Sequence, residues 1–230
     1  MRKCVQEIAN ELSHSTFLGG PVGDFEALGR LQLISLLRCG LYPYSKVLDI
    51  GCGCLRGGYW LIHFLNPDCY YGIEPNADML NAGINAFLDR EILEAKRPRF
   101  AHNPNFDPSG FGSSFDFFIA RSIWTHSSKN QIEAMLDSFV KHGAEDSVFL
   151  ASYLPSADDG YTGEGWVGRS HESNVGGMVG HGFAWIQQKC AIRGLRVAEL
   201  PVDRIRQIWL MVCKGNGCAP ITHWLRELFA

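Results

Sequence analysis

VLDIGCGCLRGG, residues 47–58, carries the clearest structural signal in the chain. An apolar run typical of a buried strand leads into a turn that contains Gly51, Gly53 and Gly57, and a helix-forming segment follows. Because glycine has no Cβ, such a turn can bend sharply and let a ligand approach the backbone closely. The order of strand, turn and helix predicts a nucleotide-type binding loop, with tight packing of the turn as the plain alternative.

Further apolar runs alternate with segments of helical period, which is the pattern of repeated βα units around a parallel sheet. Apolar stripes within 79–88, 132–140 and 183–191 predict helices, and Ser128 with Gln131 forms a capping box before the second. We therefore expect an α/β fold with one domain over residues 1–230. The expected strands are Lys46–Ile50, Tyr70–Ile73, Arg99–His102, Phe115–Ala120, Ser147–Tyr153, Leu195–Leu200 and Gln207–Cys213.

Three segments lie outside these repeats. Residues 1–40 contain two stretches with helical spacing of apolar residues and predict a helical N-terminal cap. Residues 155–182 contain eight glycines and little periodicity, which is typical of a lid-like loop. Residues 219–230 predict a C-terminal helix whose apolar stripe docks on its own domain or on a second subunit.

The overall composition limits the partners and the compartment. The chain of 230 residues has a net charge of −3, which offers no general attraction for a polyanion, so we expect no nucleic-acid partner. Residues 1–15 interleave charged and apolar residues and lack the apolar stretch of a signal peptide or membrane span, so we expect a cytoplasmic protein without a membrane partner. The eight scattered cysteines are expected to be free thiols, and no metal site is predicted.

Three side chains around the loop favour one class of ligand. Arg56 stands where a dinucleotide-binding loop has its third glycine, and its side chain would crowd a pyrophosphate. Asp49 would repel a diphosphate but suits a ligand with ammonium and sulfonium charges. Glu74 ends the next strand, where a carboxylate accepts hydrogen bonds from ribose hydroxyls; a solvated surface charge is the plain alternative. S-adenosylmethionine has these charges and no phosphate, so we expect it as cofactor, with S-adenosylhomocysteine as product.

Several segments resemble the class I S-adenosylmethionine-dependent methyltransferases. Residues 47–58 and YYGIEPN, residues 70–76, resemble motif I and the ribose-binding acid of that family, and FDFFIARSIWTH, residues 115–126, resembles its fourth motif. FEALGRLQL, residues 25–33, is similar to the lead-in of bacterial members with an LRGG-type motif I. The likeness covers most of residues 17–154. It implies a Rossmann-like, seven-stranded, mostly parallel sheet with helices on both faces and the last strand antiparallel.

The resemblance also implies residue roles. Arg56 would pair with the cofactor carboxylate through its planar guanidinium. Asn105 and Phe106 would flank the adenine, although Phe106 also fits an ordinary core position. The implied cofactor-binding residues are Asp49, Gly51, Cys52 and Gly53 for the amino acid and ribose portions, Arg56, Glu74, Pro75 and Asn76 around the carboxylate and ribose, Asn105 and Phe106, and Ala120, Arg121 and Ser122 on the methionine side.

Methyl transfer is an in-line displacement, so the enzyme mainly aligns an acceptor and excludes water. A hydroxyl or ammonium acceptor also needs a base, and His126 is the first candidate because it follows the fourth strand. The alternative is that His126 caps or packs the next helix. His171 and His181 in the Gly-rich segment are further candidates, or plain loop residues. Trp124, Tyr153 and Trp166 are expected to line an apolar acceptor pocket, with core packing as the alternative.

These observations favour methyl transfer to an O or N atom of a small-molecule acceptor, such as a sugar or secondary metabolite. The chain has no Asn-Pro-Pro-Tyr signature after the fourth strand, so methylation of nucleobase amino groups is not supported. A non-catalytic cofactor-binding partner subunit is the second hypothesis, and a nicotinamide-dependent oxidoreductase is the third. We expect a monomer or a homodimer.

Overall fold

The computed structural model describes residues 3–168, 176–200 and 207–214. Within these ranges seven strands form a sheet in the order β3-β2-β1-β4-β5-β7-β6. The strands are β1 (Val47–Ile50), β2 (Tyr70–Ile73), β3 (Arg99–Ala101), β4 (Phe115–Ala120), β5 (Gly143–Tyr153), β6 (Leu195–Glu199) and β7 (Ile208–Lys214). All seven predicted strands are therefore present, and the Rossmann-like fold class is confirmed.

The helices of the described ranges are α1 (Val5–Leu12), α2 (Phe25–Arg38), α3 (Gly58–Phe64), α4 (Ala77–Phe87), α5 (Arg90–Lys96), α6 (Lys129–His142) and α7 (Phe183–Ala191), with the short 3-10 turns η1 (Val22–Asp24), η2 (Ser109–Phe111) and η3 (Trp124–His126). The three helices predicted within residues 79–88, 132–140 and 183–191 are present as α4, α6 and α7. No helix in the described ranges is both long enough and apolar enough for a membrane span. The predicted C-terminal helix at 219–230 lies outside the described residues.

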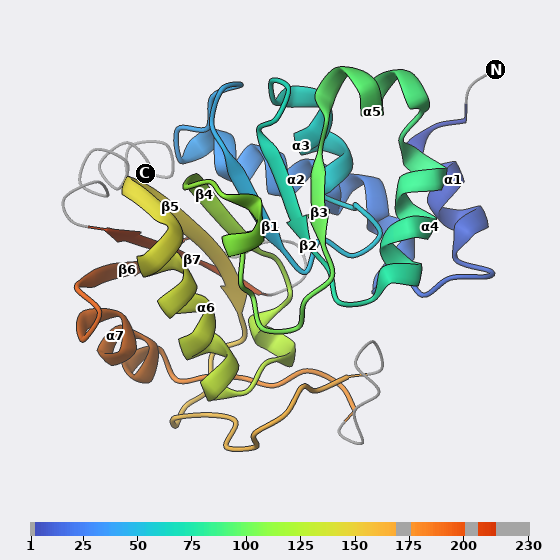
Figure 1. Ribbon diagram of the computed structural model, residues 1–230. Helices are drawn as coiled ribbons and strands as arrows, with labels where there is room; N and C mark the ends of the chain where they lie inside the picture. Colours follow the sequence, from blue (N-terminus) through green and yellow to red (C-terminus); the bar gives the residue numbers. More distant parts are fainter. Residues whose placement is uncertain (1–2, 169–175, 201–206, 215–230) are drawn as a thin grey trace. The chain divides into compact units, whose positions relative to one another are not determined.

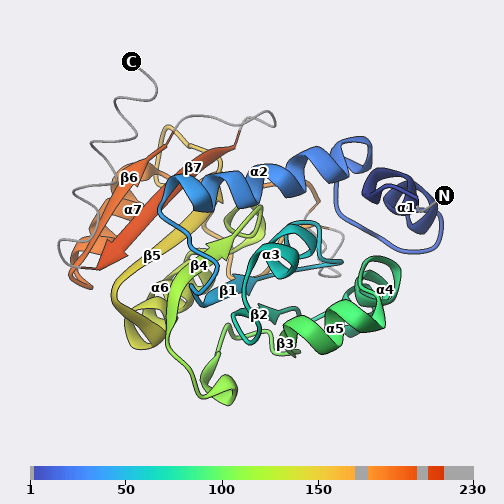
Figure 2. The same ribbon diagram turned by 90° about the horizontal axis from the view of Figure 1, so that it is seen from above.

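The chain divides into two compact units, residues 1–104 and 105–230. In the first unit β1, β2 and β3 run parallel, with Val47 opposite Tyr70 and Tyr71 opposite Arg99 (Figure 1). Helix α2 packs along α3, as Figure 2 shows. The first unit therefore contains strand β1, the glycine turn that follows it and helix α3.

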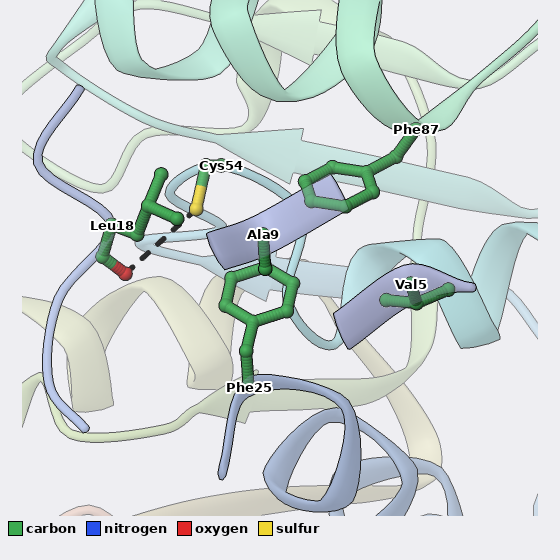
Figure 3. Packing of buried hydrophobic residues seen from close by; sticks show 6 residues of the cluster. All are labelled: Val5, Ala9, Leu18, Phe25, Cys54 and Phe87. Carbon is green, nitrogen blue, oxygen red and sulfur yellow. Dashed lines mark hydrogen bonds between the residues drawn. The ribbon is translucent and has the colours of Figure 1, made fainter. Parts of the chain in front are cut away.

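The predicted N-terminal cap is helical and packs against the glycine turn. A cluster of buried apolar side chains joins α1, the segment before α2, the turn and α4 (Figure 3): Val5, Ala9, Leu18, Phe25, Cys54 and Phe87. The rings of Phe25 and Phe87 stack with centroids 5.2 Å apart. Burial of this apolar surface fixes the N-terminal helices on the unit that carries the loop.

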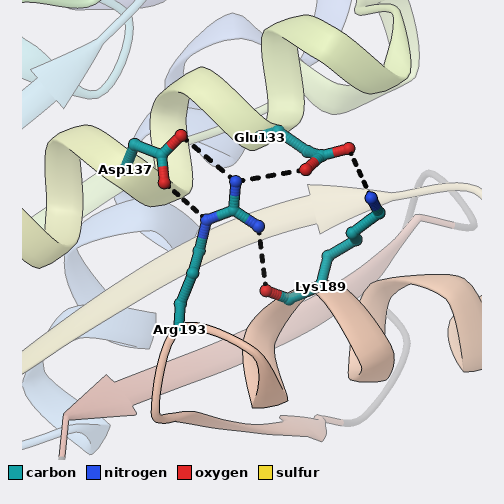
Figure 4. A network of polar contacts seen from close by, with 4 residues as sticks. All are labelled: Glu133, Asp137, Lys189 and Arg193. Carbon is teal, nitrogen blue, oxygen red and sulfur yellow. Dashed lines mark hydrogen bonds and ion pairs between the residues drawn. The ribbon is translucent and has the colours of Figure 1, made fainter.

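In the second unit β4 and β5 are parallel, whereas β7 is antiparallel to both β5 and β6. The antiparallel last strand predicted from the family resemblance is thus confirmed. Helix α6 begins with the expected capping box, in which the Ser128 hydroxyl accepts from Gln131 N–H and the Gln131 side chain accepts from Ser128 N–H. Four charged side chains connect α6 to the α7 region (Figure 4): Glu133, Asp137, Lys189 and Arg193.

Cysteine pairing differs from the sequence expectation at one position. Within the described residues, six cysteines have no disulfide bond, and all of them except Cys4 are buried: Cys4, Cys39, Cys52, Cys54, Cys69 and Cys190. Cys213 on β7, in contrast, is disulfide-bonded. Pairing requires two Cβ atoms to approach within a few ångströms, and sequence spacing does not report that approach.

Candidate functional site

The turn after β1 is tied to the end of β2 by its backbone. Gly51 and Gly53 have φ angles of +70° and +53°, in the left-handed region that favours glycine. The N–H groups of Gly51 and Cys52 both donate to the Ile73 carbonyl, at 2.8 and 3.2 Å. The turn is therefore preformed, and it places the N–H of Gly53 beside the residue that follows β2.

That residue is Glu74, whose carboxylate is fixed by two backbone donors. Gly53 N–H donates to Oε2 and Asn76 N–H donates to Oε1, both at 2.9 Å. Burial raises the pKa of Glu74, and the hydrogen bonds from Asn76 and Gly53 oppose that rise. A carboxylate oxygen has two lone-pair sites, so each oxygen keeps one for a further donor. Two fixed acceptors side by side suit a vicinal diol such as a ribose.

Asp49 lies in β1 with a buried carboxyl group, only 3% exposed. The Tyr70 hydroxyl donates to its Oδ2 at 2.8 Å. Burial raises the pKa of Asp49 to about 7; the hydrogen bond from Tyr70 opposes the rise, and the nearby charge of Glu74 adds to it. An acid held this way gains most from a cationic neighbour, because a cation stabilises its charged form.

Other glycines of the loop region serve close packing. A Cβ on Gly57 would lie 2.2 Å from the Gln32 Oε1 of α2, and one on Gly83 of α4 would lie 2.5 Å from the Cys54 backbone. Contacts this short leave no room for a side chain. The packing alternative therefore applies to Gly57, while Gly51 and Gly53 supply the left-handed bend.

The Arg56 side chain points to the N-terminal segment. Its guanidinium donates to the carbonyl oxygens of Leu18, Gly19 and Gly20 at 2.9–3.0 Å and lies over the Phe25 ring, 5.0 Å from the centroid. Burial lowers the pKa of Arg56. The structure thus gives Arg56 a role in holding residues 18–20, whereas the sequence suggested contact with a cofactor carboxylate.

Pro75 and Asn76 are exposed, and Asn76 caps α4 by accepting from Met79 N–H.

The second unit carries the other expected cofactor residues. Ser122 follows β4 with φ of +58°, and Ser122 N–H donates to the Ser152 hydroxyl at 2.7 Å. Arg121 donates to the Ser122 and Ser152 hydroxyls and to Gln207, and the Ser152 hydroxyl donates to Gln207 Oε1. This polar network holds the backbone after Ala120, which is fully buried, in its left-handed bend.

Asn105 and Phe106 open the second unit. Phe106 is buried with φ of +59°, and its carbonyl accepts from the Ser138 hydroxyl at 2.8 Å. The Phe106 ring meets Trp166 of the Gly-rich segment edge to face, with centroids 5.6 Å apart. Asn105 is exposed. The structure thus brings Phe106 and Trp166, expected at the adenine and the acceptor, against each other.

His126 connects η3 to the Gly-rich segment. Its Nδ1 lies 2.9 Å from the Val167 carbonyl oxygen, and its own carbonyl accepts from Val167 N–H at 2.7 Å. The imidazole also has a hydrogen bond with the backbone of Gly177. Burial lowers the pKa of His126, and these two contacts oppose that change. His126 therefore contacts the backbone of Val167 and of Gly177, which lie on either side of residues 169–175; those residues are not described.

Three other candidates have no exposed surface: Trp124, Tyr153 and His181. The Nε2 of His181 lies 3.1 Å from the carbonyl oxygens of Trp124 and Ser127, so this imidazole fastens the end of the Gly-rich segment to η3. Trp124 packs edge to face on Phe149, and the Tyr153 hydroxyl donates to Glu199. All three side chains are enclosed by protein in this structure. His171 lies outside the described residues.

Sequence reasoning missed three side chains that position the expected ones: Tyr70, His102 and Gln207. Tyr70 donates to Asp49, His102 Nδ1 lies 3.0 Å from the Glu74 carbonyl oxygen, and Gln207 accepts from the Arg121 and Ser152 network. Each comes from a different strand or loop than its partner. Their pairing follows from the register of the sheet, and only the polar character of Tyr70 in an apolar strand hints at it.

Structural comparison relates the chain to methyltransferases. The magnesium protoporphyrin IX methyltransferase ChlM of Synechocystis, with bound S-adenosylhomocysteine, has a TM-score of 0.59 and 14% identity over 91% of this chain and 94% of its own. The glycopeptide N-methyltransferase MtfA with bound S-adenosylmethionine has a TM-score of 0.62 and 12% identity over 81% and 94%. An S-adenosylmethionine-dependent methyltransferase of Clostridium acetobutylicum has a TM-score of 0.60 and 13% identity over 91% and 97%.

These similarities establish the fold. No protein-family model and no curated protein sequence matches the chain. At 12–14% identity the resemblance lies in the path of the backbone, which is that of the class I S-adenosylmethionine-dependent methyltransferases. Fold alone does not assign an activity; the residues that bind the ligand do.

Proposed function

We propose that this chain is an S-adenosylmethionine-dependent methyltransferase. The observation that carries the proposal is the Glu74 carboxylate, which Gly53 and Asn76 hold in place at the glycine turn with one acceptor site left on each oxygen. A ribose diol supplies two donors at that spacing. The nearby Asp49 carboxyl adds a negative charge that suits an ammonium or sulfonium group.

The same residues argue against a dinucleotide cofactor. A pyrophosphate needs backbone N–H groups at the loop and no neighbouring negative charge. Here the Gly53 N–H donates to Glu74, and the Gly51 and Cys52 N–H groups donate to the Ile73 carbonyl. With these donors already engaged and two acids close by, a diphosphate would meet repulsion. A nucleoside without phosphate fits the loop better.

We further propose that the acceptor is a small molecule methylated on O or N. The similar structures include a magnesium protoporphyrin IX methyltransferase, a glycopeptide N-methyltransferase and an O-methyltransferase family protein, so this fold serves both kinds of acceptor atom. The net charge of −3 supports a partner other than nucleic acid. The LRGG sequence of residues 55–58 supports a place among the bacterial-type members.

In this proposal different residues bind the cofactor and take up the acceptor's proton. Asp49 and Glu74 bind the amino acid and ribose ends of the cofactor, and the left-handed turn at Gly51 and Gly53 allows close approach of the backbone. The bound cofactor supplies an electrophilic methyl group. His126 is the proposed base: burial lowers its pKa, which favours the neutral imidazole that can take the acceptor's proton.

Thermal unfolding with S-adenosylhomocysteine tests the cofactor assignment. A ligand at a hundred times its dissociation constant stabilises the protein by about 2.7 kcal/mol, which raises the unfolding temperature measurably. Glu74→Ala is expected to abolish this rise, because the ribose loses both acceptors. The matched control is Glu91→Ala, which removes an exposed carboxylate of α5 in the same unit. A full response from the Glu74 variant would contradict the placement of the ribose.

Turnover distinguishes an enzyme from a non-catalytic binding subunit. Incubation with cofactor labelled on the methyl group and an extract of small metabolites should transfer label to a low-molecular-weight product. His126→Ala should reduce this transfer at least about tenfold while retaining the thermal response to S-adenosylhomocysteine. Binding without any transfer of label would favour the binding-subunit hypothesis.

A further inference from the structure

Tyr70 places a phenol hydroxyl inside the first unit, next to the glycine loop. The side chain is 2% exposed and stands at the first position of β2. Its hydroxyl donates to Asp49 Oδ2 at 2.8 Å and also has a hydrogen bond with the Cys52 side chain. The phenol thus joins the acid of β1 to the middle of the turn.

Gly58 provides the space for that hydroxyl. A Cβ at Gly58 would lie 2.6 Å from the Tyr70 hydroxyl oxygen and 2.8 Å from Leu55 Cδ2. Gly58 is the first residue of α3 and adopts ordinary helical geometry, so its backbone does not need glycine. Alanine is the better helix former, so the glycine here is explained by the approach of Tyr70.

We propose that Tyr70 is a positioning residue for cofactor binding: its hydroxyl fixes the Asp49 carboxyl beside the glycine loop. The absence of a side chain at Gly58 leaves room for that hydroxyl. The inference rests on the proposed function, because it concerns the acid that faces the cofactor's positive charges. It adds a residue outside motif I to the machinery, together with a measurable consequence for the pH dependence of binding.

The groups around Asp49 determine how cofactor affinity changes with pH. Tyr70, Cys52 and Glu74 are the titratable groups that act on it, and Tyr70 is the one that favours its charged form. With a pKa of about 7, Asp49 is partly protonated in the free protein at neutral pH. A ligand ammonium binds better to the carboxylate, so affinity should rise as pH increases through about 7. Loss of the Tyr70 hydroxyl should move this rise to higher pH.

Isothermal titration of the full chain with S-adenosylhomocysteine between pH 5.5 and 8 tests the proposal. For the wild type, affinity should increase with pH across this range. Tyr70→Phe should shift the midpoint upward by about one unit, so that its affinity at pH 6.5 falls about tenfold while the loss at pH 8 is smaller. Tyr71→Phe is the control: it removes the hydroxyl of the neighbouring buried tyrosine on the same strand.

Two further variants separate positioning from general damage to the fold. Asp49→Asn should flatten the pH profile, and adding Tyr70→Phe to it should leave the profile flat. Gly58→Ala should weaken binding by displacing Tyr70, and in a Tyr70→Phe background the same change should cost less because the hydroxyl oxygen is gone. If Tyr70→Phe does not fold, the profile of Gly58→Ala decides the matter alone, since displacement of the hydroxyl predicts the same upward midpoint shift.

The outcomes are distinct. Wild-type binding with an upward midpoint shift in Tyr70→Phe supports the proposal. If the wild type binds and Tyr70→Phe has the same pH profile, or loses the same factor of affinity at every pH, the role of Tyr70 is overturned and the proposed function stands. Failure of the wild type to bind S-adenosylhomocysteine at any pH overturns both.

Discussion

At the scale of single residues, two acids in different environments surround the glycine turn. Glu74 is held by backbone N–H groups at both oxygens, and those bonds favour its charged form. Asp49 is buried with one phenol donor, and burial dominates its titration. Glu74 is therefore suited to accept hydrogen bonds from a neutral diol, and Asp49 to bind a positively charged group.

Asp49 should make the stability of the free protein depend on pH. Its pKa is raised from 3.8 to about 7 on folding, so the native state retains a proton that the unfolded chain has lost between these values. Stability from this group is fully present below pH 3.8 and is lost as pH rises to about 7. The loss is on the order of 4 kcal/mol, at about 1.4 kcal/mol per pKa unit.

Urea unfolding at pH 5 and pH 8 measures this effect, with Asp49→Asn as the comparison because asparagine does not titrate. The variant should gain stability relative to the wild type on going from pH 5 to pH 8. Parallel changes in the two proteins would show that Asp49 is already charged at pH 5 in the native state.

At the scale of elements, Arg56 links the glycine turn to the N-terminal cap. One half-buried guanidinium holds three consecutive carbonyl groups, those of Leu18, Gly19 and Gly20, just before η1 and α2. Leu18 of this segment and Phe25, the first residue of α2, belong to the apolar cluster with α1, the turn and α4. The turn's shape and the position of the N-terminal helices are therefore coupled within the first unit.

Arg56→Lys should weaken this link even though the charge is retained. A lysine ammonium cannot span three carbonyls with a planar set of donors, so two of these carbonyls lose a charged donor, at a cost of about 2 kcal/mol. We expect lower stability in urea and faster proteolysis of residues 1–24. Arg90→Lys is the control, because Arg90 pairs with Glu94 on the exposed surface of α5. Equal stability of the two variants would contradict the role given to Arg56.

At the scale of the whole molecule, the sequence predicts the strands well and the polar contacts poorly. The strands are short apolar runs bounded by turns, so all seven are found within a few residues of their limits. Strand β5 starts at Gly143, earlier than predicted. The sequence did not predict these first residues as part of a buried strand because they include Glu145 and Asp146, which are charged and exposed. Helix α5 has only seven residues, too few to show a helical period.

The candidate site shows the same limit. Glycine bends and an acid at a strand end follow from local sequence, so Gly51, Gly53 and Glu74 are predictable. The partners Tyr70 and His102 lie 21 and 28 residues from Asp49 and Glu74, and their contacts depend on strand register and side-chain direction. Burial was equally hidden: Trp124 follows a strand, Tyr153 ends one and His181 lies in a glycine-rich loop, yet all three are fully enclosed. Tertiary packing decides both features.

A crystal structure of the chain grown with S-adenosylhomocysteine would show whether Glu74 binds the ribose. We expect density for the nucleoside at the glycine turn, with its two ribose hydroxyls within hydrogen-bond distance of the Glu74 carboxylate oxygens. Density for a diphosphate nucleotide at this turn, or a ribose that makes no contact with Glu74, would contradict it.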